Sequence, residues 1–301
     1  MSAAATPRRP RVRPLPATTA RTPTASPTSA LRPNRRRLSA YDRREDGISR
    51  RRFVLIAIEG IDGAGKTHIS RKLARALAER GRRAVYVDKK DISFGDGFAD
   101  GRLALIKEAL WPIRGEPGQD LLGTRFYLHL LAAWFAATGR YFEHQAARNT
   151  DTLHVTDGSY YRVIAKAHLR SGMEIEHLRG FFTEAAEPDL VVLLDLEPRA
   201  AWARRSAFKE TEIGRWDGFT GDPQEAFCAY QQQVRRVLRA LCEKQNWVLI
   251  DQSVMHNDAE IVDHIMTQVE RERVALKSEP EAQRHQTAGA HDATNGRFGT
   301  C

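Results

Sequence analysis

The chain has 301 residues, 42% of them apolar, and its 47 Lys and Arg outnumber 38 Asp and Glu, giving a formal net charge of +9. This composition indicates a globular protein of one or two domains, and a membrane protein is excluded because no apolar run approaches the ~18 residues of a spanning helix. Its cysteines, Cys228, Cys242 and Cys301, are widely spaced, so neither a disulfide framework nor a zinc site is supported and a reducing, cytoplasmic location is predicted.

The basic charge is concentrated at the N-terminus, where residues 1–52 contain 14 Arg and three acidic residues. Seven of the 13 prolines also lie there, and apolar periodicity is almost absent. We therefore predict a disordered basic tail over residues 1–51. Such a segment also resembles an organelle transit peptide, and it could hold nucleic acid through phosphate contacts. A second disordered tail is predicted over residues 273–301, which leaves a folded domain over residues 52–272.

The folded domain alternates short apolar runs with helical patterns. The runs are typical of parallel strands buried on both faces, and they cover residues 53–58, 84–88, 153–157, 190–195 and 247–251. Helices are predicted between and after them, over residues 66–79, 99–110, 118–147, 160–169, 198–207, 223–244 and 258–270. This alternation predicts a three-layer α/β domain, a P-loop NTPase fold with a five-stranded parallel sheet flanked by helices. In such sheets ligands bind at the carboxyl ends of the strands.

A phosphate-binding loop follows the first predicted strand directly. Residues 60–67, GIDGAGKT, match G-x-x-x-x-G-K-[ST] at every fixed position and lead into a helix. In this loop, main-chain N–H groups and the helix N-terminus face phosphate oxygens. Lys66 is expected to reach the β- and γ-phosphates, and the Thr67 hydroxyl is expected to ligate Mg²⁺. The predicted nucleotide-binding residues are Gly60, Asp62, Gly63, Ala64, Gly65, Lys66, Thr67 and His68.

An acidic residue at a strand end is expected to hold Mg²⁺ through its water shell. Asp157, at the end of the third predicted strand, is the first candidate, and Glu59 is the second. The alternative for Asp157 is that it only begins a turn with Gly158.

The chain resembles the thymidylate kinase family of P-loop nucleoside monophosphate kinases over residues 53–270. IEGIDGAGKT at residues 58–67 is close to the family's I-E-G-x-D-G-x-G-K-[ST] loop, and PDLVVLLDLEP at residues 188–198 is similar to its P-D-L-x-x-x-L-D-x-x-P strand. The resemblance implies ATP and Mg²⁺ as cofactors and dTMP or a related monophosphate as acceptor. It also implies a lid after the fourth strand, with arginines that stabilise the transferring group. The implied catalytic residues are Lys66, Arg204, Arg205 and Arg215.

The acceptor half departs from the family pattern. Where the family has R-E-P-G, residues 88–91 read DKKD, and where it has D-R-[YH], residues 157–162 read DGSYYR. An R-G-E-P-G string occurs only at residues 114–118, too late in the chain. Lys binds an anion without the bidentate fork of Arg, so we predict that dTMP is a poor acceptor. The predicted acceptor-binding residues are Asp62, Lys89, Lys90, Arg125, Trp134 and Arg162.

Trp134 and Phe135, on the long helix, could stack on a base, although aromatic residues in so apolar a helix are more often part of the core.

Together these features predict a kinase that moves the γ-phosphoryl group of ATP to a nucleoside monophosphate. Such an acceptor is already anionic and needs no strong general base. Two alternatives stay open: a kinase of a hydroxyl acceptor with Asp62 or Glu59 as the base, and a non-catalytic nucleotide-binding protein whose basic tail contacts nucleic acid. The family resemblance also implies a homodimer.

Overall fold

The computed structural model describes residues 54–111, 122–148 and 152–278. The chain divides into two units, Met1–Ile48 and Ser49–Cys301, and all described residues belong to the second. The predicted basic tail, the string at residues 114–118 and residues 279–301 lie outside the described residues.

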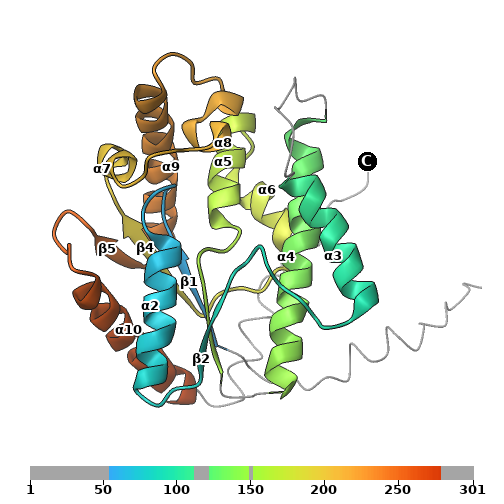
Figure 1. Cartoon of the computed structure of the whole chain (residues 1–301), viewed down its shortest axis with the longest axis vertical. Coiled ribbons are helices and arrows are strands. Elements are labelled where there is room, and N and C mark those ends of the chain that lie inside the picture. The colour runs from blue at the N-terminus through green and yellow to red at the C-terminus, as the bar shows by residue number, and fades with distance from the viewer. Residues whose placement is uncertain (1–53, 112–121, 149–151, 279–301) are drawn as a thin grey trace, which may run out of the picture. The chain divides into compact units, whose positions relative to one another are not determined.

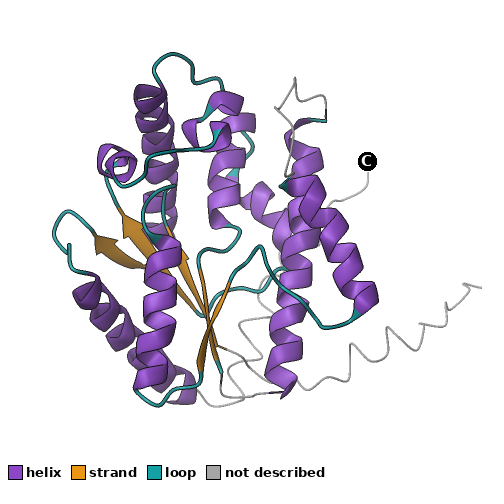
Figure 2. Ribbon diagram, in the orientation of Figure 1, coloured by secondary structure: helices purple, strands orange, loops and turns teal. Residues whose placement is uncertain are grey.

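One sheet of five parallel strands forms the centre of the second unit (Figures 1 and 2). Its strands lie in the order β2-β3-β1-β4-β5, and all four pairings are parallel. This arrangement confirms the predicted fold class. The strands are β1 (Val54–Glu59), β2 (Ala84–Val87), β3 (Leu153–Thr156), β4 (Leu190–Asp195) and β5 (Val248–Asp251).

All seven predicted helices are present, and four short helical turns were not predicted because they are too brief to show a period. The predicted helices are α2 (Lys66–Glu79), α3 (Gly97–Leu110), α4 (Gly123–Arg148), α5 (Tyr161–Ser171), α7 (Pro198–Ala203), α9 (Pro223–Gln245) and α10 (Asp258–Ser278). The short ones are α6 (Ile175–Arg179), η1 (Gly180–Phe182), α8 (Glu210–Ile213) and η2 (Arg215–Asp217). Helix α10 continues past residue 272, the predicted end of the folded domain.

The helices form two layers about the sheet. Helices α2 and α10 pack together against the strands, while α9, α5 and α4 form the second layer (Figure 1). Successive β1 residues point to opposite faces. Leu55 accordingly packs in a cluster with Trp134 and Phe142 of α4, and Ile56 belongs to the larger core with Leu73 of α2. No helix in the described part of the chain is long and apolar enough to span a membrane.

Candidate functional site

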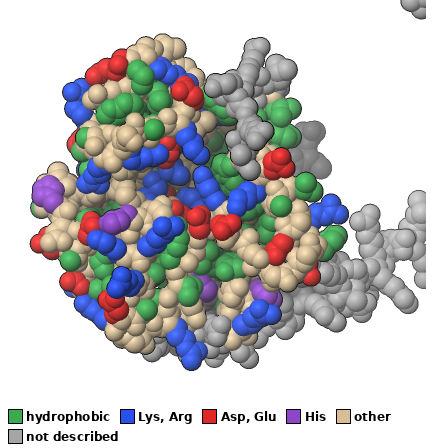
Figure 3. Space-filling view, in the orientation of Figure 1, with side chains coloured by type: hydrophobic (Ala, Val, Ile, Leu, Met, Phe, Trp, Pro, Cys, Tyr) green, Lys and Arg blue, Asp and Glu red, His purple; other side chains and the backbone are tan. Residues whose placement is uncertain are grey.

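A pocket of about 780 Å³ opens at the carboxyl ends of the strands. Figure 3 shows Lys and Arg side chains gathered around the hollow. Most of the predicted site residues line it, although they come from segments far apart in the sequence. The lining includes Asp62, Gly63, Ala64, Gly65, Lys66, Thr67, His68, Lys89, Lys90, Asp157, Arg162, Arg204 and Arg205. The structure therefore brings the loop, the lid and the altered acceptor residues to one space.

The phosphate-binding loop packs tightly on the elements beneath it. A Cβ atom on Gly60 would lie 2.7 Å from the Leu194 carbonyl oxygen, and one on Gly63 would lie 3.0 Å from that of Ala201. A side chain is strained at both positions, because both contacts are with main-chain atoms and both residues have positive φ angles, 149° at Gly60 and 83° at Gly63. The loop then enters α2 at Lys66, which aims the helix N-terminus at the pocket.

Lys66 is buried in the loop, with 8% of its surface exposed. Its Nζ donates hydrogen bonds to the carbonyl oxygens of Gly60 at 3.0 Å and Ile61 at 2.6 Å. Burial, together with the neighbouring Arg162, lowers the pKa of Lys66 well below its usual value. A bound anion would favour the charged ammonium and oppose this shift.

Thr67 and Asp157 both line the pocket and contact each other. The Thr67 hydroxyl donates a 2.5 Å hydrogen bond to Asp157 Oδ2. Burial works to raise the pKa of Asp157, but Lys89 and the Thr67 hydrogen bond hold it below its usual value, so the carboxylate is ionised at neutral pH. The contact favours the metal-site prediction for Asp157 over the turn alternative. Two hard oxygen donors are suited to Mg²⁺.

The altered acceptor residues form a cluster of cations. Lys89 is 9% exposed, and its Nζ donates to the Asp157 carbonyl oxygen at 3.1 Å. Burial and Arg162 lower the pKa of Lys89 to about 8. Burial, Arg162 and Lys209 lower the pKa of Lys90. Because Arg162 lowers the pKa values of both lysines, the cluster is suited to an anionic ligand.

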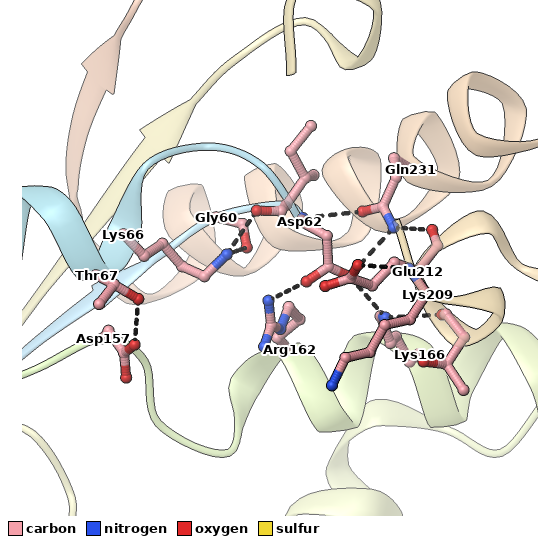
Figure 4. Close-up of polar contacts among 12 residues, drawn as sticks. Gly60, Asp62, Lys66, Thr67, Asp157, Arg162, Lys166, Lys209, Glu212 and Gln231 are labelled. Atoms are coloured by element: carbon pink, nitrogen blue, oxygen red, sulfur yellow. Dashed lines mark hydrogen bonds and ion pairs between the residues drawn. The ribbon is translucent and has the colours of Figure 1, made fainter. Parts of the chain in front are cut away.

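Asp62 is the centre of a hydrogen-bond network (Figure 4). Its carboxylate pairs with Arg162 and, at 2.8 Å, with Lys166 Nζ. Burial works to raise the pKa of Asp62, but these two cations hold it well below its usual value. Arg162 therefore lines the pocket beside the phosphate-binding loop. A carboxylate paired in this way is a weak proton acceptor.

The predicted lid arginines differ in their placement. Arg204 Nη1 donates to Gln252 at 2.8 Å and Arg205 Nη1 donates to Glu212 at 3.3 Å, and both residues line the pocket. Arg215 does not. Its guanidinium donates to the carbonyl oxygens of Phe219 at 3.1 Å and Gly221 at 2.8 Å, so here it stabilises the turn before α9. Its catalytic role stays a prediction.

Two predicted acceptor residues also lie elsewhere. Arg125 is exposed on the first turn of α4 and does not line the pocket. Trp134 is only 1% exposed, its indole N–H donates to the Lys89 carbonyl oxygen at 2.8 Å, and its ring packs edge-on against Trp111. The ring therefore belongs to the core, which favours the core alternative for Trp134 over stacking on a base.

Replacing Trp134 with Phe should destabilise the protein by about 2 kcal/mol, because it removes the partner of a buried carbonyl oxygen and leaves a gap. Urea denaturation measures the free energy of unfolding. Trp216, which is 39% exposed, gives the matched control, and Trp216→Phe should change stability by less than about 0.5 kcal/mol. Equal stability of the two variants would contradict a core role for Trp134.

Several polar residues of the site were not predicted. They are Lys166, Glu212, Gln231, Gln252 and Asp258, all of which contact predicted site residues. Lys166 had a signal, since it follows Arg162 by one helical turn and so shares its face. Gln231 had none, because a polar residue on an amphipathic helix is usually solvent-exposed.

Comparison with known proteins identifies several relatives. No protein-family model matches the chain. The chain is 30% identical to a probable thymidylate kinase of Thermococcus onnurineus over 155 residues, which cover 50% of this chain and 70% of that protein. It is 32% identical to a thymidylate kinase of Xanthomonas euvesicatoria over 158 residues, which cover 50% of this chain and 60% of that protein. A solved thymidylate kinase from Ehrlichia chaffeensis matches with a TM-score of 0.47 and 15% identity, covering 71% of this chain and 98% of that one.

Proposed function

We propose that this chain, which belongs to the thymidylate kinase family of nucleoside monophosphate kinases, transfers the γ-phosphoryl group of ATP, with Mg²⁺, to a nucleoside monophosphate. The observation that carries this proposal is the pocket itself. In it the phosphate-binding loop and the cation cluster of Lys89, Lys90 and Arg162 face the same space, as a reaction between two phosphates requires.

The donor half supplies positive charge for the ATP phosphates. Lys66, the N-terminus of α2, Arg204 and Arg205 converge on the pocket, and such fixed charges stabilise a transferring phosphoryl group. Thr67 and Asp157 would hold Mg²⁺, which supplies further charge neutralisation at the phosphate oxygens. No group of three or more His, Cys, Asp and Glu side chains that could hold a metal occurs among the described residues. This fits Mg²⁺, which commonly combines one or two protein oxygens with substrate phosphates and water.

The acceptor half binds the second phosphate. Lys89, Lys90 and Arg162 would pair with its oxygens and place it in line with the donor. The two residues considered as bases for a hydroxyl acceptor are poorly suited to that role. Asp62 is paired with two cations, and Glu59 is fully buried, accepts the Ser159 N–H at 2.7 Å and does not line the pocket. This arrangement supports an acceptor that needs no deprotonation.

The acceptor is a nucleoside monophosphate other than dTMP, in our proposal. Lysines replace the forked arginine at residues 88–91, and Trp134 is unable to stack on a base from inside the core. A panel of nucleoside and sugar monophosphates, compared by kcat/KM at saturating ATP, tests the function. A hundredfold preference for dTMP would overturn the acceptor proposal, and ATP consumption that no acceptor stimulates would favour the non-catalytic alternative.

The kcat/KM for the acceptor should fall above pH about 8, where Lys89 of the enzyme without acceptor loses its proton. The charged ammonium, which binds the acceptor anion, is present below this pKa and disappears as the pH rises through it. The alkaline fall in kcat/KM for the acceptor reports the free enzyme. In Lys89→Arg it should move to higher pH, because a guanidinium keeps its charge. An alkaline fall at the same pH in both proteins would contradict this role for Lys89.

Other properties stay predictions. They are the cytoplasmic location, the homodimer, the partition into a kinase domain and two tails, and any nucleic-acid contact of the basic tail, which lies outside the described residues.

A further inference from the structure

We propose that Gln231 and Lys166 are positioning residues that tie Asp62 of the phosphate-binding loop to the lid segment, defined here as residues 204–214. These contacts hold Arg205 in a fixed position relative to the phosphate-binding loop, on the wall of the pocket. The kinetic consequence rests on the proposed function, whereas the tie itself is a property of the fold. Figure 4 shows the network, in which side chains of α5 and α9 reach between the loop and α8.

Gln231 makes three hydrogen bonds from a fully buried position on α9. Its Oε1 accepts the Asp62 N–H at 3.1 Å. Its Nε2 donates to Asp62 Oδ2 at 3.2 Å and to the Glu212 carbonyl oxygen at 2.7 Å. Only an amide offers the acceptor and the two donors that this position uses. A carboxylate would lose both donors and would repel Asp62.

Lys166 makes the same connection from α5. Its Nζ donates to Asp62 Oδ2 at 2.8 Å and to the Thr211 carbonyl oxygen at 3.3 Å. Thr211 and Glu212 both belong to α8 (Glu210–Ile213), and the last carbonyl groups of a helix lack partners within it. Gln231 and Lys166 therefore satisfy two carbonyl groups of this short helix and dock it on the loop.

Glu212 extends the tie into the pocket. Its main-chain oxygen is held by Gln231, while its carboxylate accepts from Arg205 Nη1 at 3.3 Å and from the Lys209 N–H at 2.9 Å. Arg205 lines the pocket. A continuous path thus runs from Asp62 through Gln231 and Glu212 to Arg205, and losing Gln231 should misplace Arg205 without removing any group that touches ATP.

A double-mutant cycle on the full chain tests the coupling. Gln231→Met should lower kcat by about tenfold while changing the KM for ATP by less than about threefold, the pattern of lost transition-state stabilisation. The fold-loss of kcat in the double variant Gln231→Met/Arg205→Ala should be clearly smaller than the product of the two single fold-losses, because the two residues act in one unit. Val234→Ala is the matched control, since Val234 is also fully buried on α9, and its effect should multiply with that of Arg205→Ala. Multiplicative behaviour of Gln231→Met would overturn the proposal.

Hydrogen exchange provides a readout that does not depend on activity. Amides of residues 204–214 should exchange about tenfold faster in Gln231→Met than in Val234→Ala, because the tie opens locally. If Gln231→Met fails to fold, Lys166→Met provides the same test, because the Lys166 side chain is 24% exposed in the parent. It should also speed exchange of these amides. Equal exchange in the tie variant and the control would overturn the tie. If the parent transfers no phosphoryl group to any acceptor, the proposed function fails, while the exchange result still decides the tie.

Discussion

Replacing Lys66 with Ala should lower ATP turnover by roughly 10²-fold or more, because the reaction depends on charge neutralisation at the phosphates. Lys66 is the cationic residue of the loop, where its Nζ donates hydrogen bonds to the carbonyl oxygens of Gly60 and Ile61. We expect the ammonium to leave those carbonyls for the phosphates when ATP binds. Turnover is measured at saturating ATP and acceptor.

The control for this variant lies on the same helix. Arg75 of α2 is 83% exposed and pairs only with Glu79 among the described residues, so Arg75→Ala should leave turnover within about twofold of the parent. Circular dichroism and thermal melting check that Lys66→Ala is folded. A folded Lys66→Ala protein that keeps more than about a third of the parent's turnover would refute the role of Lys66.

Replacing Arg162 with Leu should lower kcat/KM for the acceptor by roughly 10²-fold, since an unscreened cation on an anionic group contributes about 1.5–3 kcal/mol. The change should leave the KM for ATP within about threefold, because Lys66, Thr67 and the lid arginines stay in place. Lys166 would still partner Asp62, which limits the damage to the loop. Steady-state kinetics with each substrate varied in turn separate the two effects.

Charge rescue and a remote arginine serve as controls for Arg162. Arg162→Lys should recover part of the loss, because it keeps the charge but lacks the fork. Arg140→Ala should have little effect, since Arg140 is 51% exposed on α4 and pairs with Glu143. An equal rise in the KM values of ATP and acceptor in Arg162→Leu would place Arg162 in the donor half and contradict our assignment.

The parts of the molecule that were predictable from sequence are those with a local signal. Apolar runs and helical periods depend on neighbouring residues, so all five strands and the seven longer helices could be predicted. The phosphate-binding loop is contiguous, and its glycines, Lys66 and Thr67 carry the pattern in eight residues. Asp157 could be placed because it follows a strand directly, and parallel strands end at one edge of a sheet.

The parts that were not predictable depend on contacts between distant segments. Gln231 lies 169 residues from Asp62 along the chain, and nothing near it in the sequence marks that contact. Trp134 and Arg215 belong to residue types that often bind ligands, yet the direction of each side chain is set by tertiary packing. Lys166 and Gln231 donate hydrogen bonds to carbonyl groups of the short helix α8. Its four residues are too few to show a periodic pattern in the sequence.

The close packing beneath the phosphate-binding loop affects how genetic variation in it should be interpreted. Gly60 and Gly63 have positive φ angles and closely approach main-chain atoms of Leu194 and Ala201, so substitutions there strain the framework before any nucleotide arrives. In a library scored for both cellular abundance and activity, variants at these two positions should disappear from the abundant fraction. Variants at Lys66 should stay abundant and inactive. A variant library would therefore separate the loop into a structural half and a chemical half, although a single motif spans both.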